Sequence, residues 1–174
     1  MPTFMTTVSG KEVNPAAPTP GDISLGDIAT GLSHTPRFGG QTKKVMSVAQ
    51  HSVHVYQLVP LEHRLQGLMH DAAEAYLGDM IYPVKLLVPQ FKELELKWAM
   101  AIATAVGYDH VLHEAVVTAD LQAQLAEARK LGVHNCEEWG LPETDLIVER
   151  VWSPREARVE FVKALAELQV KGPK

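Results

Sequence analysis

Residues 68–79 read LMHDAAEAYLGD, and this segment combines a helical pattern with polar groups that are rare on the buried face of a helix. Glu74 lies four residues after His70 and three after Asp71, so the three side chains share one face of the predicted helix. The residues between them are apolar. Because burying polar groups costs free energy unless they are paired or ligated, the pattern favours a metal site.

Helical spacing extends from this segment over most of the chain. The apolar periodicity predicts helices over residues 25–32, 44–59, 61–76, 90–106, 110–130 and 154–170. Asp22 or Ser24 is expected to cap the first helix, and Ser153, Pro154 and Glu156 form a strong start signal for the last. The glycines at 78, 107 and 132 are expected to end their helices.

The remaining segments are expected to be irregular. Residues 33–42 and 132–152 contain Gly and Pro and are predicted loops, the second with a short extended piece at 146–151. Residues 1–22 are predicted to form an extended arm or a short β-hairpin that turns at Gly10. Residues 23–174 then form one domain, so the predicted fold is all-α, a compact helical bundle with an N-terminal arm.

Composition limits the function. The chain has 174 residues, enough for one domain with a substantial core, and a formal net charge of −5. No dense basic cluster is present, which argues against duplex nucleic acid as a partner but leaves small anions open. No apolar run approaches the roughly 20 residues that cross a bilayer, and no secretory signal is evident, so we expect a cytoplasmic protein without membrane contact.

Two further residues complete a predicted ligand set with His70 and Asp71. His51 lies in the preceding predicted helix, and Asp120 lies between apolar residues in a later one. Two imidazoles and two carboxylates suit Zn, Mn, Fe, Co or Ni rather than a structural zinc, which usually prefers thiolates. Four ligands leave positions open on a six-coordinate ion for water and a phosphate oxygen, so the set predicts a catalytic metal ion.

The order of these motifs resembles the HD-domain phosphohydrolases. His51 is followed by the segment 68–79, by Pro83-Val84-Lys85 and by Asp120, and the likeness extends from about residue 22 to residue 129. Within that family the pattern is most similar to the small 5′-deoxynucleotidases and to the phage dATP triphosphohydrolases of 2-aminoadenine genomes. The resemblance implies an HD-type fold, a homo-oligomer (dimer or hexamer) and a cytoplasmic site of action, including that of a phage-infected host cell.

The resemblance also implies roles for residues around the ligands. Glu74 and Asp79 match acidic residues that position or deprotonate the attacking water, or that hold additional Mg ions with a polyphosphate. Lys85 matches a phosphate-contacting residue. Arg37 and Phe38 match a pair in which Arg meets phosphate or sugar while the aromatic ring packs on the base.

Several of these side chains have simpler interpretations from the residues alone. Lys85 can be an ordinary solvated lysine, and Phe38, next to two glycines, can be a core residue. His54 lies one helical turn after His51, so it can support the ligands or merely pack.

We therefore expect a metal-dependent deoxynucleotide phosphohydrolase that uses Zn, Co or Mn, with additional Mg on the polyphosphate. The best single substrate is dATP, cleaved to deoxynucleoside and triphosphate. A 5′-deoxynucleotidase that acts on monophosphates is the alternative in the same class. A nucleotide sensor without turnover and a structural protein with a buried metal are alternatives from other classes.

Overall fold

The computed structural model describes residues 3–170, and the ends of the predicted arm (1–2) and of the predicted domain (171–174) lie outside the described residues. The mainly helical architecture predicted from the sequence is confirmed. The α-helices are α1 (Leu25–His34), α2 (Val48–Leu58), α3 (Arg64–Met69), α4 (Glu74–Leu77), α5 (Tyr82–Lys85), α6 (Pro89–Val106), α7 (Glu114–Leu131) and α8 (Pro154–Val170). Short 3-10 turns are η1 (Pro20–Asp22), η2 (Arg37–Gly40), η3 (Leu61–His63) and η4 (Cys136–Trp139).

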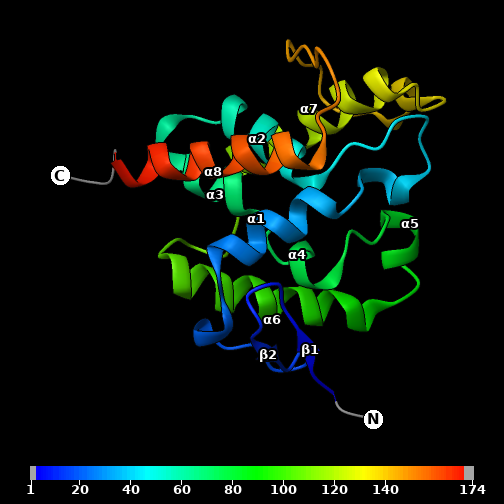
Figure 1. Ribbon diagram of the computed structural model, residues 1–174. Helices are drawn as coiled ribbons and strands as arrows, with labels where there is room; N and C mark the ends of the chain where they lie inside the picture. Colours follow the sequence, from blue (N-terminus) through cyan, green and yellow to red (C-terminus); the bar gives the residue numbers. More distant parts are fainter. Residues whose placement is uncertain (1–2, 171–174) are drawn as a thin grey trace.

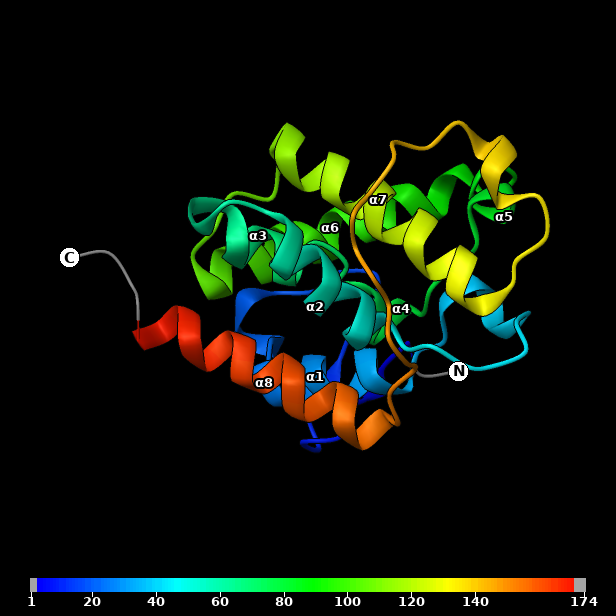
Figure 2. The same ribbon diagram turned by 90° about the horizontal axis from the view of Figure 1, so that it is seen from above.

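Helix α2 is central and packs against α1, α3, α7 and α8. Figure 1 shows α8 and α6 on opposite sides of the molecule with α1 between them, and Figure 2 shows α2 between α8 and α7. The largest buried cluster joins five of these helices through Leu32, Val53, Leu68, Trp98 and Phe161. Because α2 is surrounded on several sides, polar side chains on it must find buried partners.

The N-terminal arm contains the predicted hairpin, made of β1 (Met5–Thr6) and β2 (Glu12–Val13). Met5 pairs with Val13 in antiparallel register, and Gly10 in the turn has φ +84°, which suits glycine. Val13 is buried in the main cluster, and the ring nitrogen of Trp98 donates to the carbonyl of Pro15 at 3.0 Å. The arm is thus packed onto the helices rather than extended away from them.

Two predicted helix starts were too early by four residues. α2 begins at Val48 because Ser47 caps it, with its Oγ accepting from the amide of Gln50 at 3.3 Å. Ser47 also forms an isolated bridge with Pro36, which keeps the residues before α2 extended. α7 begins at Glu114, where His113 Nδ1 accepts from a backbone amide in the first turn.

The irregular segments agree only in part with the loops predicted from the sequence. The predicted loop 33–42 begins with the last residues of α1 and contains η2, whereas Ser24 is the cap that precedes α1. Residues 132–152 are irregular apart from η4, and the extended piece predicted at 146–151, within the described range, forms no strand. Among the described helices, none combines the length and the apolar character that crossing a membrane requires.

The single helix predicted over residues 61–76 is wrong, because the structure divides this range into shorter elements. The chain there forms η3, α3, a turn at residues 70–73 and α4. His70 Nδ1 donates to the carbonyl of Gly67 at 2.8 Å, so the ring is hydrogen-bonded to the backbone of the last turn of α3. The following bonds, from Ala72 to Met69 and from Glu74 to Asp71, span three residues rather than four. Helix α3 therefore ends next to His70, at the place where the predicted ligands lie.

Gly31 allows α1 to approach α4 closely. A Cβ atom at this position would lie 2.6 Å from the carbonyl oxygen of Ala75 and 2.9 Å from its Cα. We expect Gly31→Ala to push the helices apart and lower the free energy of unfolding by about 2 kcal/mol or more, measured by urea denaturation. Gly26→Ala is the matched control on α1, because its nearest neighbour would be Ser24 Oγ at 3.7 Å. Equal effects of the two substitutions would contradict this explanation.

Candidate metal centre

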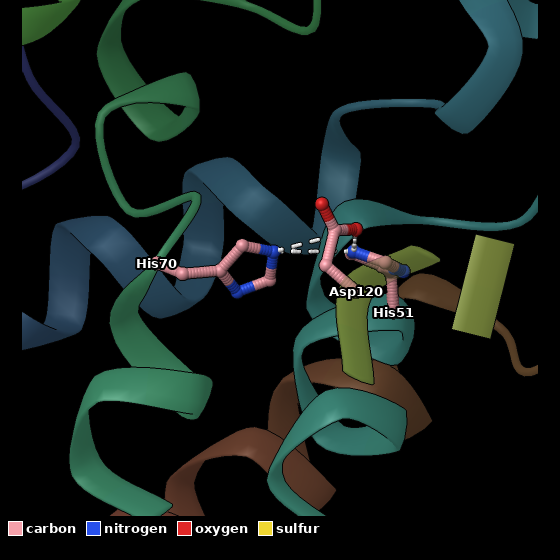
Figure 3. A group of neighbouring side chains, drawn as sticks. All are labelled: His51, His70 and Asp120. Carbon is pink, nitrogen blue, oxygen red and sulfur yellow. Dashed lines mark hydrogen bonds and ion pairs between the residues drawn. The ribbon is translucent and has the colours of Figure 1, made fainter. Parts of the chain in front are cut away.

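Side chains from three separate segments meet at one point (Figure 3). His51 comes from α2, His70 from the turn after α3, and Asp120 from α7. One ligand atom from each lies within 4.8 Å of the other two. His51 Nε2 is 3.3 Å from His70 Nε2 and 3.1 Å from Asp120 Oδ1. The fold thus brings residues 51, 70 and 120 together, as the predicted ligand set requires.

Asp71 approaches the same two rings. Its Oδ2 lies 3.1 Å from His70 Nε2 and 3.5 Å from His51 Nε2. The turn at residues 70–73 makes this possible, because it places both neighbours in the sequence toward the same point. Asp71 therefore lies close to both imidazoles, while the group whose ligand atoms are all within 4.8 Å of one another is His51, His70 and Asp120.

The hydrogen bonds of the rings determine which nitrogens are available. His51 Nδ1 faces the carboxylate of Glu127 at 3.0 Å, and His70 Nδ1 faces the carbonyl of Gly67 at 2.8 Å. Both partners only accept, so both Nδ1 atoms carry hydrogen and the Nε2 lone pairs of the neutral rings face each other. A proton or a metal ion between the rings relieves the repulsion between these two lone pairs. Donors roughly 3 Å apart also fit ligands that share one ion at 2.0–2.2 Å, so the residues fit a divalent metal.

The charged groups around the two rings also favour positive charge at this point. Burial and Arg37 lower the pKa of His51, but Glu127 and Asp120 outweigh them and the pKa is raised. Burial likewise opposes protonation of His70, yet Asp71 and Asp120 raise its pKa well above the ordinary value. The carboxylates therefore stabilise a cation at the rings despite their burial.

Glu127 is the main residue that the sequence analysis missed. It lies on α7, fully buried, and its Oε1 accepts from His54 Nδ1 at 2.8 Å as well as from His51 Nδ1. Burial would raise the pKa of Glu127, but His51, His54 and Arg37 lower it below the usual range. Its spacing from Asp120, seven residues or two helical turns, was the available signal, because it places both carboxylates on one face. His54 thus contacts Glu127, the carboxylate that also contacts the predicted ligand His51.

Arg37 reaches the site because the chain reverses before α2. Its amide donates to the carbonyl of Met46 at 2.8 Å, beside the bridge between Pro36 and Ser47. Its guanidinium lies between two carboxylates, with Nε 3.4 Å from Glu127 Oε2 and Nη1 3.9 Å from Asp71 Oδ2. Arg37 Nε has no hydrogen bond within the described part of the chain. The Arg37 side chain therefore lies at the candidate metal centre with an Nε–H group that makes no hydrogen bond there.

Phe38 packs against buried residues and also contacts Arg37. Its φ of +55° is in the left-handed region, and its ring packs against a small buried cluster that includes Met46 and Leu131. The Arg37 guanidinium carbon lies 5.4 Å from the centre of the ring. Packing against this cluster matches the simpler interpretation of Phe38, while the ring also supports Arg37.

Glu74 opens α4 and is buried close to the ligands. Its Oε2 has no hydrogen-bond partner among the residues that the structure describes. Burial, together with the charges of Asp71 and Asp79, raises the pKa of Glu74 well above its usual value. A buried carboxyl group with an unpartnered oxygen is suited to exchanging a proton with a ligand.

Lys85 and Asp79 complete the set predicted from the sequence. Lys85 Nζ lies 2.7 Å from Glu95 on α6 and 3.7 Å from Glu74, so it is an ion-paired residue rather than a freely solvated one. Burial and the charge of Asp71 raise the pKa of Asp79, against the opposing charges of Arg37 and Lys85. Both residues thus belong to the electrostatic surroundings of the candidate metal centre.

Comparison with known proteins gives relatives over nearly the whole length. No protein-family model matches the chain. It is 36% identical over 169 residues to "Uncharacterized protein YfdR" of Escherichia coli K12, covering 95% of each chain. It is 34% identical over 175 residues to "Uncharacterized protein RCAP_rcc00048" of Rhodobacter capsulatus, covering 88% of this chain and 89% of the relative. These names state no activity.

Proposed function

The chain belongs to the family of the Escherichia coli protein YfdR, and for this member we propose the activity of an HD-type, metal-dependent phosphohydrolase that acts on deoxynucleotides. The observation that carries the proposal is the pair of Nε2 atoms of His51 and His70, 3.3 Å apart, with two carboxylates beside them. Such a mixed nitrogen and oxygen set favours a catalytic metal over a thiolate-bound structural one.

His51, His70, Asp71 and Asp120 would hold the ion, with Zn, Co or Mn as the candidates. When bound, such an ion supplies Lewis acidity, lowering the pKa of water and polarising a phosphoryl oxygen. The side chains of Asp71 and Asp120 are 21% and 34% exposed, whereas those of the histidines are nearly covered, so a ligand can approach from the carboxylate side.

The surrounding residues supply proton transfer and charge. The unpartnered oxygen of Glu74 can orient a water molecule and accept its proton, while Asp79 assists in orienting water or holds Mg on a polyphosphate. Arg37 and Lys85 offset the negative charge that accumulates on the phosphoryl oxygens. Lys85 would exchange the carboxylate of Glu95 for a phosphate, one anionic partner for another.

The proposed substrate is dATP, because residues 49–52 (AQHS) and 71–79 (DAAEAYLGD) are more similar to the phage dATP triphosphohydrolases than to the 5′-deoxynucleotidases. Water attacks the α-phosphorus, the bond to the 5′ oxygen breaks, and that oxygen takes up a proton. The products are deoxyadenosine and intact triphosphate. We also propose that the protein acts in the cytoplasm as a dimer or a hexamer.

A substrate panel tests the proposal. Chelator-treated protein would be reloaded with Co, Mn or Zn, with and without Mg, and offered each dNTP and dNMP, with products separated by anion-exchange chromatography. We expect equal amounts of deoxyadenosine and triphosphate from dATP, only after metal loading. Orthophosphate from dAMP with dATP intact would instead assign a 5′-deoxynucleotidase. Metal-loaded protein that cleaves no nucleotide would refute the phosphohydrolase, and dATP binding without products would indicate a sensor.

A further inference from the structure

We propose that Glu127 is a positioning residue of the metal centre, where one buried carboxylate orients the ring of His51 and keeps Arg37 from competing for Asp71. The inference rests on the proposed function in so far as that function requires a metal ion. Its decisive measurement is metal binding, which can be made whether or not the protein cleaves a nucleotide.

Glu127 determines the orientation of His51. Both carboxylate oxygens of Glu127 lie close to His51 Nδ1, at 3.0 and 3.1 Å. A carboxylate only accepts, so the hydrogen of the ring is held at Nδ1 and the Nε2 lone pair points toward His70 and Asp120. In the other tautomer, an N–H bond would occupy the space where the ion is expected. The negative charge of Glu127 also makes Nε2 a stronger donor to a metal.

The carboxylate of Glu127 is itself held rigidly. Glu127 is fully buried, and His54 Nδ1 donates to its Oε1 at 2.8 Å. His54 is itself fixed by Gln50, whose amide nitrogen lies 3.4 Å from His54 Nε2 and 2.9 Å from the carbonyl of Arg150. This chain of contacts links the irregular segment before α8 to the back of the metal centre. Glu127 therefore has little freedom to turn away from His51.

Glu127 also balances the charge of Arg37. Its Nε lies 3.4 Å from Glu127 Oε2, and its Nη1 lies 3.9 Å from Asp71 Oδ2. Glu127 compensates this buried cation, so the charge of Asp71 remains available to a metal ion. If Glu127 were neutral, Arg37 would be drawn to Asp71 and would repel a divalent ion beside it.

The substitution Glu127→Gln tests both effects while keeping the shape of the side chain. The amide has no charge, and its NH2 group faces groups that are themselves donors. We expect the Kd for Co²⁺, titrated into chelator-treated protein, to rise about 10- to 100-fold, with a change in the visible absorption of the bound ion. Thermal unfolding of the metal-free proteins would show whether the variant keeps its fold.

The matched control is Glu167→Gln, because Glu167 also accepts a hydrogen bond from a residue of α2, the hydroxyl of Tyr56 at 2.8 Å, but lies on α8. Its Kd for Co²⁺ should equal that of the wild type. Asn at position 54 can place an N–H near the position of His54 Nδ1, so His54→Asn should bind Co²⁺ more tightly than His54→Leu.

A measurement on the unaltered protein keeps the inference testable if Glu127→Gln fails to fold. Long-range ¹H–¹⁵N NMR spectra of the Zn-loaded protein should show hydrogen on Nδ1 of His51. Hydrogen on Nε2, or a folded Glu127→Gln variant with wild-type Co²⁺ affinity and absorption, would overturn the inference. If this variant bound Co²⁺ more weakly but the wild type cleaved no nucleotide, the inference on Glu127 would stand and only the proposed phosphohydrolase activity would be refuted.

Discussion

The His70→Asn variant is expected to lose Co²⁺ binding by at least about 100-fold and hydrolysis by at least about 1000-fold, the latter equivalent to about 4 kcal/mol of transition-state stabilisation. The reason is that asparagine lacks an atom equivalent to Nε2, which lies 3.3 Å from His51 Nε2 and 3.1 Å from Asp71 Oδ2. Asparagine can still donate to the carbonyl of Gly67, the contact that ends α3. The substitution therefore separates the ligand role of His70 from its structural role.

The measurements are Co²⁺ titration followed by visible absorption, and product formation from dATP at saturating metal. His134→Asn is the control, because His134 is exposed in the segment after α7. It should match the wild type in both measurements. If His70→Asn bound Co²⁺ as tightly as the wild type, the ion would not lie between the two imidazoles.

The Glu74→Gln variant is expected to keep the metal and lose turnover, by about 10²- to 10⁴-fold in kcat. Glutamine has nearly the same shape as glutamate, so the packing of α4 should persist. It cannot accept a proton from water, which is the role proposed for the unpartnered Oε2 of Glu74. The expected separation of effects, an unchanged Kd for Co²⁺ with a fallen kcat, distinguishes this residue from the ligands.

Steady-state kinetics with dATP and Co²⁺ titration of the same preparation make this comparison. Glu137→Gln serves as the matched control, since Glu137 pairs with Arg129 on the surface and should affect neither quantity. An unchanged kcat in Glu74→Gln would show that Glu74 takes no part in the proton transfer.

Much of the fold was predictable from local patterns. The hairpin at Gly10, the end of α6 at Gly107 and the start of α8 at Ser153 all follow from residues close in the sequence. In α8, for example, Ser153 and Glu156 form reciprocal bonds that need nothing beyond four consecutive residues. Such signals depend on backbone geometry, which neighbouring residues determine.

The prediction of one helix over residues 61–76 was wrong because of contacts in the tertiary structure. Its periodicity is helical throughout, yet the ring of His70 takes the carbonyl of Gly67 and the chain turns. Local propensity could not reveal this, because the ring is held there by its position between α2 and α7. The interruption is what lets His70 and Asp71 lie at the same point.

The sequence by itself determined the helical class and the residue types of a mixed nitrogen and oxygen site, because periodicity and spacing are properties of short segments. The tertiary structure alone decided that Glu127 would lie behind His51 and that Arg37 would lie between Glu127 and Asp71. These contacts join residues up to 90 positions apart, from 37 to 127, and burial is what makes them strong. A carboxylate on a helix becomes a buried partner of two histidines only when the packing of α2 against α7 encloses it.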